Sequence, residues 1–325
     1  MSEIFKRDPV DVVVVGGGLS GLGAALTLVR ARRSVVVIDA GNPRNAPAAH
    51  SHGYLTRDGA PPLELLRLGR EEIRGYGGEI VSGAVESVAR AGERLFRVTT
   101  AEGDRYAGRR LLITTGLVDV FPDIPGLHER WGNDVVHCPF CFGWELRDQA
   151  LGVLATGPQA TMQALMWRQW SSDVTLFLHT APEPTDEQRQ QLAARGVRVV
   201  GGEVTRVEVE DNKITGVRLS HGEVVPRQAI IVGPQFQARH RLLDGLGVEV
   251  VDHPMGIGRQ VKAEPSGFTG VPGVWVAGNV ADVTAGVMQS AASGVTAAAT
   301  LNADLTQEDV ALAVESMRTA ASAGL

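Results

Sequence analysis

The sequence holds only two cysteines in 325 residues, and they stand close together, at Cys138 and Cys141. No second cysteine pair and no suitably spaced pair of histidines completes a four-ligand zinc site. A structural disulfide across so short a loop would remove little entropy from the unfolded chain. A Cys-x-x-Cys pair can instead open and close, and can hold one sulfur as a thiolate near neutral pH. The pair therefore favours redox chemistry, with a structural disulfide or a metal half-site as the alternatives.

Long apolar runs and an excess of positive charge are also missing. The sequence has no uninterrupted stretch of about 18 apolar residues, and its first residues lack the apolar segment of a signal peptide. The net charge of −6 and the pI near 5.8 argue against nucleic acid and anionic membranes as partners. We therefore expect a cytoplasmic protein. In that reducing compartment, an isolated Cys-x-x-Cys is more often catalytic than structural.

Glycine and apolar residues, by contrast, are abundant. The 39 glycines indicate many tight turns and close backbone approaches, which nucleotide-binding α/β folds require. With 44% hydrophobic residues and a mass of 34.5 kDa, the chain can bury a large core. Its length is sufficient for two domains.

The N-terminal part of the sequence has the pattern of a complete βαβ unit. Residues 10–15 form an almost unbroken β-branched run, which is typical of a strand buried on both faces of a parallel sheet. A helix rich in alanine and leucine is predicted to about residue 32. A second buried strand follows over residues 34–38, and Asp39 ends it.

Three glycines, Gly16, Gly18 and Gly21, lie between the first strand and the helix. Gly16 permits a tight turn, Gly18 lets a pyrophosphate approach the backbone, and Gly21 lets the helix pack close to the strand. The N-terminus of the helix offers free N–H groups to the phosphates. Asp39 can accept a hydrogen bond from a ribose 2′-hydroxyl and would repel a 2′-phosphate. The unit therefore predicts FAD or NAD as the ligand rather than NADP.

A second strand–helix–strand pattern spans residues 151–179. Residues 79–118 and 197–232 have the pattern of hairpin strands, and the proline-rich residues 121–125 are a plausible linker. The two βαβ units are the only internal repeat and do not suggest a solenoid. We therefore predict an α/β fold with two Rossmann-like dinucleotide-binding domains.

In their order along the chain, these motifs resemble those of the low-molecular-weight thioredoxin reductase family. The matching segments are residues 16–21, Asp39, and residues 114–116, 138–141 and 276–279. The resemblance implies a homodimer with a thioredoxin reductase-like fold. Its FAD domain would be discontinuous, over residues 1–119 and 237–325, and a central domain over residues 120–236 would carry the cysteines.

The resemblance also implies FAD as the cofactor and a set of FAD-binding residues. These are Gly16, Gly18, Gly21, Asp39, Ala40, Thr115, Gly116, Gly278 and Asn279. Asn279 departs from the family, which usually has aspartate there, but an amide can still form a hydrogen bond to the ribityl chain of FAD.

The NADPH site of the family is altered in this sequence. The second glycine fingerprint, over residues 155–160, has Ala155 at its first glycine position. The family has an arginine-rich stretch after the next strand, whereas this chain has Glu183, Asp186 and Glu187 and no arginine before Arg189. Arginine holds a 2′-phosphate, and carboxylates repel it. We expect NADPH to be a poor donor; the alternative is a backbone-only site that takes NADPH weakly or takes NADH.

The surroundings of the cysteines depart from the family as well. Phe142 stands where the reductases have an acid/base aspartate. His137, just before the first cysteine, titrates in the useful range and can take a thiol proton; its alternative role is packing or capping. His50 and His52 lie in a loop that approaches the flavin in this superfamily, so either ring can contact the flavin or have only a loop role.

A redox dithiol, a flavin site and a damaged NADPH site together resemble the flavin-dependent dithiol oxidases of disulfide natural products, of the holomycin and gliotoxin type. That resemblance implies the formation of an intramolecular disulfide in a small-molecule dithiol, with O₂ reduced to H₂O₂. Cys138, Cys141 and His137 would be the catalytic residues, and no metal is expected. The alternatives are a thioredoxin or protein-disulfide reductase fed by NAD(P)H or ferredoxin, and a flavin-loaded redox sensor without turnover.

Overall fold

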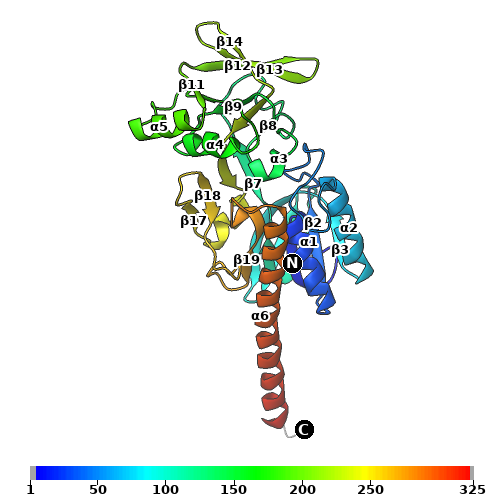
Figure 1. Ribbon diagram of the computed structural model, residues 1–325. Coiled ribbons are helices and arrows are strands. Elements are labelled where there is room, and N and C mark those ends of the chain that lie inside the picture. Colours follow the sequence, from blue (N-terminus) through cyan, green and yellow to red (C-terminus); the bar gives the residue numbers. More distant parts are fainter. Residues whose placement is uncertain (1–4, 323–325) are drawn as a thin grey trace.

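Two β-sheets with their helices, one mixed and one parallel, organise the chain into two lobes, which lie one above the other in Figure 1. The computed structural model describes residues 5–322. We call the lobe with the N-terminal strands the first lobe and the lobe with the two cysteines the second lobe.

The first lobe is built on a seven-stranded sheet: β1 (Val10–Val15), β2 (Val35–Asp39), β3 (Glu79–Ser82), β4 (Val85–Gly92), β5 (Leu95–Thr100), β6 (Arg105–Ile113) and β19 (Val274–Val276). The strand order is β3-β2-β1-β6-β5-β4, and β19 also pairs with β6. The strands β1, β2, β3, β6 and β19 are parallel, and β4 and β5 extend the sheet in antiparallel fashion.

Three helices pack on one face of this sheet: α1 (Leu19–Arg30), α2 (Pro62–Gly75) and α6 (Val287–Ser322). Val12 and Val14 of β1 are buried in the cluster that α1 and α6 share, whereas Val13 and Val15 belong to a second cluster on the other face. Because β1 is covered on both faces, every position in its central run is apolar rather than every second one.

The second lobe has a five-stranded sheet of order β11-β10-β9-β15-β8, with all neighbours parallel. Its strands are β8 (Val135–Val136), β9 (Leu151–Leu154), β10 (Val174–Phe177), β11 (Arg198–Val200) and β15 (Ala229–Val232). Its helices are α3 (Pro139–Phe142), α4 (Ala160–Trp167) and α5 (Asp186–Ala194).

Two smaller sheets complete the fold. An antiparallel sheet joins β12 (Val204–Glu210), β13 (Lys213–Leu219) and β14 (Val224–Pro226). A mixed sheet joins β7 (Leu117–Val120), β16 (Gln235–Ala238), β17 (Val250–Asp252) and β18 (Gly258–Val261), with β16 and β18 parallel and the other neighbours antiparallel. The 3₁₀ helices of the described residues are η1 (Arg241–Leu246) and η2 (Gly278–Val280). The chain enters the second lobe after β7 and returns through β16, which pairs with β7. The predicted domain boundaries fall within these two strands, and the division itself stays a prediction.

The predicted α/β class is confirmed, but two local predictions are wrong. The strand at the start of residues 79–118 is not part of a hairpin, because β3 pairs in parallel with β2. In residues 197–232, only β12 to β14 are hairpin-like, since β11 and β15 join the parallel sheet. In both cases the partner strand is distant in the sequence, so local alternation carries no signal for it.

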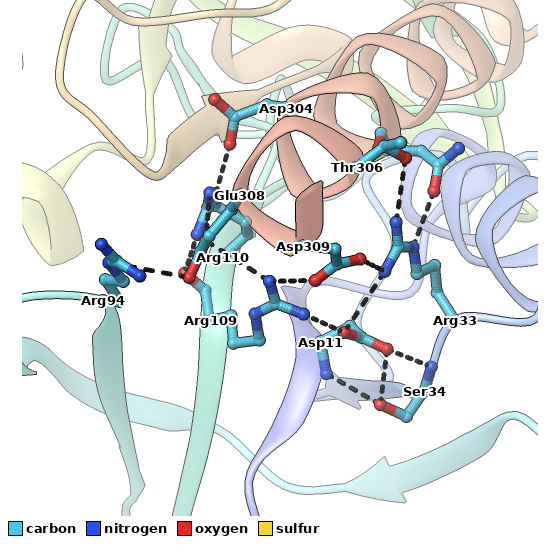
Figure 2. A network of polar contacts seen from close by, with 11 residues as sticks. Asp11, Arg33, Ser34, Arg94, Arg109, Arg110, Asp304, Thr306, Glu308 and Asp309 are labelled. Carbon is cyan, nitrogen blue, oxygen red and sulfur yellow. Dashed lines mark hydrogen bonds and ion pairs between the residues drawn. The ribbon is translucent and has the colours of Figure 1, made fainter. Parts of the chain in front are cut away.

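Helix α6 starts beside the carboxyl ends of the first-lobe strands and runs past their amino ends (Figure 1). Three arginines at the amino ends pair with three carboxylates of the helix: Arg33, Arg109 and Arg110 face Asp304, Glu308 and Asp309 (Figure 2). The hydrogen bond from Arg33 to Asp309, at 2.7 Å, holds the pKa of that carboxyl below its ordinary value. Beyond Asp309, every described residue of the helix is exposed.

Candidate active site

A single cavity of about 1000 Å³ extends from the carboxyl ends of β1, β2 and β6 to the cysteine pair of the second lobe. This volume is at the upper end for small-molecule and cofactor sites. Parallel strands place their following loops at one edge of the sheet, which is where such sites form. The cavity is therefore the candidate active site.

The glycine turn after β1 forms one wall of the cavity. Gly16 has φ +107°, and a Cβ atom there would lie 2.5 Å from the carbonyl oxygen of Thr114. A Cβ on Gly21 would lie 2.0 Å from the oxygen of Gly16, so the helix could not approach the turn. A Cβ on Gly18 would meet no protein atom within 4 Å. The space beside Gly18 is thus open toward the cavity.

Gly18 is also the N-cap of α1 and caps the helix with no side-chain hydrogen bond. The first N–H groups of this helix are therefore available to a ligand, next to the positive end of its dipole. An open space at a glycine and uncapped N–H groups together fit the pyrophosphate of a dinucleotide.

Asp39, at the end of β2, is held from two sides. Its Oδ1 accepts a hydrogen bond from the N–H of Gly17 at 2.9 Å, and its Oδ2 lies 2.6 Å from an Nη atom of Arg70 on α2. Asp39 and Ala40 both border the cavity. Because Arg70 offsets the charge of Asp39, repulsion of a 2′-phosphate by the carboxylate alone is weaker than the sequence suggests.

The opposite wall comes from the loops after β6 and β19. Thr115 donates its hydroxyl to the carbonyl oxygen of Arg239 at 2.7 Å, and Gly116 follows with φ +72°. Gly278 and Asn279 border the same space. The side-chain amide of Asn279 donates to the carbonyl oxygens of Asp282 (3.0 Å) and Ala285 (2.8 Å). Its own carbonyl oxygen therefore remains as the acceptor that Asn279 can offer to a ligand.

Cys138 and Cys141 form a disulfide and border the cavity from the second lobe. Cys138 is the N-cap of the short helix α3, Cys141 lies within that helix, and both are half-buried. Phe140 between them is 76% exposed, whereas Phe142 packs against the core of the second lobe. The aromatic residue at the family's aspartate position is thus a core residue, which supplies no proton.

The ring of His137 lies between aromatic rings and borders the cavity. It stacks on Trp131 at a centroid distance of 5.4 Å and meets Phe236 edge-on at 5.8 Å. Its Nδ1 is inaccessible to solvent and has no hydrogen-bond partner among the described residues. Burial, helped by the nearby charge of Arg44, lowers the pKa of His137 to about 4. The ring is therefore neutral at physiological pH and can accept a proton only at a cost in free energy.

We predict that this ring weakens the fold in acid. Its pKa in the folded protein lies below the ordinary value near 6.5, so the unfolded chain binds a proton first as the pH falls. The ring's contribution to the free energy of unfolding is complete above about pH 6.5 and is lost toward about pH 4, by roughly 2–3 kcal/mol. His137→Phe, which keeps the stacking but cannot titrate, should lose less stability between these pH values in urea unfolding. His221→Gln, at an exposed histidine, is the control; parallel curves for wild type and His137→Phe would contradict the prediction.

His50 and His52 border the cavity from the loop between β2 and α2. His50 Nδ1 lies 2.9 Å from the carbonyl oxygen of Gly59, a contact within the loop. His52 reaches from Asp58 of its own loop to Glu145 of the second lobe. Whether either ring contacts a flavin stays a prediction.

The second fingerprint differs from the first in structure as well as in sequence. Ala155 is buried, and α4 begins only at Ala160, after a turn with Gln159 as an N-cap that makes no side-chain bond. The hydroxyl of Thr156 donates to the carbonyl oxygen of Gly233 at 2.6 Å and joins the carboxyl ends of β9 and β15. In Rossmann-like folds a dinucleotide crosses this edge of the sheet. The first fingerprint has an equivalent bond, from the hydroxyl of Thr114 to the carbonyl oxygen of Gly16 at 2.8 Å. The two fingerprints therefore differ in Ala155 and in the later start of the helix rather than in this bond.

The charges beyond β10 also disfavour NADPH. Arg189 pairs with Glu183 at 3.1 Å and lies 3.6 Å from Asp186, so carboxylates already occupy the nearest arginine. His179 uses its Nδ1 to accept the N–H of Val204 at 3.1 Å, and burial lowers its pKa. Neither side chain is free to hold a 2′-phosphate as a cation.

The cavity thus brings together all the predicted site residues except Gly21. Gly21 does not border the cavity and instead packs against the glycine turn at Gly16. Sequence reasoning missed five further residues of the site or its support: Arg44, Arg70, Trp131, Phe236 and Arg239. No local pattern marks them, since each reaches the site from a different segment. The described residues contain no group of three or more His, Cys, Asp or Glu side chains placed for a metal, and no helix among them is long and apolar enough to cross a membrane.

Comparison with known proteins gives consistent relatives. The family model described as pyridine nucleotide-disulphide oxidoreductase matches residues 10–303. Thioredoxin reductase tcpT of Claviceps purpurea is 30% identical over 91% of this chain and 95% of its own length. The crystal structure of HlmI matches 98% of this chain and 100% of its own at 47% identity, with a TM-score of 0.91. An oxidoreductase from Agrobacterium tumefaciens matches 92% and 99% at 33% identity, with a TM-score of 0.85.

Proposed function

The chain belongs to the pyridine nucleotide-disulphide oxidoreductase family, and we propose that it is an FAD-dependent dithiol oxidase that closes an intramolecular disulfide in a small-molecule dithiol. Membership makes it a flavin-dependent disulfide oxidoreductase with a thioredoxin reductase-like fold. The observation that carries the proposal is the contrast between its two fingerprints. The first opens into the same cavity as the cysteine pair. The second has Ala155 at its first glycine position, and carboxylates pair with Arg189 where the family has free arginines.

The residues around the cavity fit FAD. The open space at Gly18 and the uncapped helix α1 suit its pyrophosphate, Asp39 suits a ribose hydroxyl, and the free carbonyl oxygen of Asn279 suits the ribityl chain. FAD, when bound, would accept an electron pair from the reduced cysteines and pass it with two protons to O₂ as H₂O₂.

The cysteines carry out the exchange with substrate. A substrate thiolate attacks Cys138 Sγ, breaks its bond to Cys141 and forms a mixed disulfide, with Cys141 leaving as a thiolate. The second substrate thiol then attacks the substrate sulfur of the mixed disulfide, closes the product ring and releases Cys138. Two electrons have moved from substrate to the cysteine pair, and the two substrate protons have gone to the cysteines or to a nearby base.

We propose that His137 is the base that takes a substrate proton, and that it holds this proton only transiently. The ring is neutral and borders the cavity beside Cys138, so one of its nitrogens is unprotonated and can accept a proton. Its low pKa means that it holds the proton only briefly and returns it without becoming trapped as a cation.

The proposal predicts that peroxide forms without a nicotinamide. Under air, a small dithiol should yield nearly one H₂O₂ per disulfide formed, and NADPH should not change this ratio. Loss of two or three charge-assisted contacts, at roughly 1.5–3 kcal/mol each, should weaken NADPH binding by at least about a hundredfold relative to an arginine-bearing site. The measurement is peroxide and disulfide yield with and without NADPH.

The competing function is a protein-disulfide reductase, which the names of several curated relatives favour, among them the probable thioredoxin reductase of Arthroderma benhamiae. Rapid consumption of NADPH that depends on added thioredoxin, with no peroxide from dithiols, would replace the oxidase by the reductase. The same assay with reduced ferredoxin in place of NADPH tests ferredoxin as the electron donor.

The remaining parts of the proposal concern assembly and place. We propose a homodimer, a cytoplasmic location, and a division into an FAD domain over residues 1–119 and 237–325 and a central domain over residues 120–236. The resemblance to the thioredoxin reductase family supports the homodimer and the domain division, whereas the location rests on the sequence expectation given above. Light scattering of the purified protein tests the first.

A further inference from the structure

One side chain spans the two lobes at the mouth of the cavity. The Nδ1 of His52 lies 3.3 Å from Asp58 Oδ2, within the loop of the first lobe, and its Nε2 lies 3.4 Å from Glu145 Oε1 in the second lobe. The ring of His50, a further titratable group, lies at a centroid distance of 6.3 Å. His52 therefore stands between two carboxylates, one from each lobe.

Asp58 fixes the proton on the first nitrogen. Its Oδ1 accepts the N–H of Gly53 at 2.8 Å, and this bond, together with that of His52, lowers the pKa of Asp58. Asp58 is thus a carboxylate near neutral pH, and His52 Nδ1 must carry a hydrogen to meet it. The loop around it is braced by the bonds from Ser51 to Ala60 and from Gly59 to Ser51, at 2.8 and 2.9 Å.

The second nitrogen is then the variable one. In the neutral ring, Nε2 has a lone pair that faces the carboxylate of Glu145, which is repulsive. In the doubly protonated ring, Nε2 donates to Glu145 and the charges attract. One proton on His52 therefore decides whether the two lobes are joined or pushed apart at this point.

Glu145 transmits this contact to the cysteines because the segment between them is stiff. The N–H of Gly143 donates to Pro139 at 2.7 Å, and that of Leu146 to Phe142 at 3.1 Å. A Cβ on Gly143 would lie 2.6 Å from Trp170, so the turn is pressed against the second lobe. These bonds link the backbone on both sides of Glu145 to the turn that carries the disulfide.

We propose that His52 is a proton-operated latch that holds the cysteine turn over the cavity. With Nε2 protonated, His52 binds Glu145 and keeps the disulfide facing the cavity. When that proton is lost, the turn is released and the disulfide becomes more accessible from solvent. The inference rests on the proposed function only in taking the cysteine pair as the reacting group, and His52 acts as a positioning residue.

The test measures access to the disulfide in the purified holoenzyme, without substrate turnover. A phosphine reductant opens Cys138–Cys141, and mass spectrometry after alkylation counts the thiols over time. Rates are compared at about pH 5.5 and about pH 8.5, a range over which imidazole side chains in general change charge. The reduction rate of each variant is divided by the rate of wild type at the same pH, which removes the pH dependence of the reagent's own reactivity.

His52→Gln should be reduced about threefold faster than wild type at the lower pH and at the wild-type rate at the higher one, because an exposed ion pair is worth this much. In Glu145→Gln, the disulfide should be reduced more slowly than in wild type at the higher pH. The glutamine amide can donate to the neutral Nε2, so the latch no longer needs the second proton.

His221→Gln removes an exposed histidine that pairs with Glu223 at 3.2 Å, outside the cavity, and serves as the matched control with a ratio near one. A His52→Gln ratio near one at both pH values, or raised equally at both, would overturn the latch. If turnover assays show a reductase instead of an oxidase, these ratios are unaffected, so the two failures are distinguishable.

Discussion

Serine in place of Cys141 should abolish turnover, by at least about a thousandfold, and should leave Cys138 able to form a stable mixed disulfide. Dithiol oxidation needs both sulfurs, since the enzyme disulfide is the immediate electron acceptor. In the variant, Cys138 is a free thiol that can attack a disulfide but has no neighbour to expel the bound half. The expected product is a covalent adduct at one position.

An aromatic disulfide reagent makes this visible. The reduced wild type should release about two equivalents of the aromatic thiol and end as the internal disulfide, with no reagent attached and two hydrogens fewer than the reduced protein. Cys141→Ser should release about one equivalent and keep the other half of the reagent on Cys138. We propose that Cys141 faces the flavin, as the order of the two cysteines in the thioredoxin reductase family implies. In Cys138→Ser, labelling of Cys141 should therefore be slower. Faster labelling of Cys141 than of Cys138 would reverse the two roles.

Alanine in place of Gly18 should strip the protein of its flavin while leaving the fold intact. The added methyl group meets no protein atom within 4 Å, so the apoprotein has no reason to unfold. It would instead occupy the space in which we place the pyrophosphate and block one or two charge-assisted hydrogen bonds. At roughly 1.5–3 kcal/mol each, their loss weakens FAD binding about a hundredfold.

The readouts are the flavin-to-protein ratio after dialysis and the midpoint of thermal unfolding without and with added FAD. The chain supplies a matched control, because Gly157 holds the same place in the second fingerprint and its Cβ would also meet nothing within 4 Å. Gly157→Ala should keep its flavin. Equal flavin loss in both variants, or none in Gly18→Ala, would show that the turn after β1 is not the pyrophosphate site.

The βαβ unit of the first lobe could be predicted in detail because its signals are local. The apolar run over residues 10–15 follows from burial on both faces, and the glycines that follow are required by contacts within one turn. The same reasoning found the damage to the second fingerprint. It could not find the bond from Thr156 to Gly233, since these residues meet only once the parallel sheet has formed.

The surroundings of His137 were beyond sequence reasoning for a similar reason. Arg44, Trp131 and Phe236 come from three separate segments, and together they turn an ordinary histidine into a neutral, enclosed ring. Arg70 likewise reaches Asp39 from a helix with no motif of its own. Long-range contacts of this kind determine the electrostatics of the site, whereas the motif residues determine where in the fold the site lies.

Helix α6 has the cavity at one end and an exposed C-terminal portion at the other, and this portion can serve for immobilisation of the protein. The helix begins at the cavity, is fastened by Arg33, Arg109 and Arg110 at the far edge of the sheet (Figure 2), and continues as an exposed rod (Figure 1). At 1.5 Å per residue, its free portion reaches about 20 Å from that edge. An enzyme tethered to an electrode or a bead through residue 322 would therefore turn its cavity outward, with the support on the opposite side of the sheet from the cysteines.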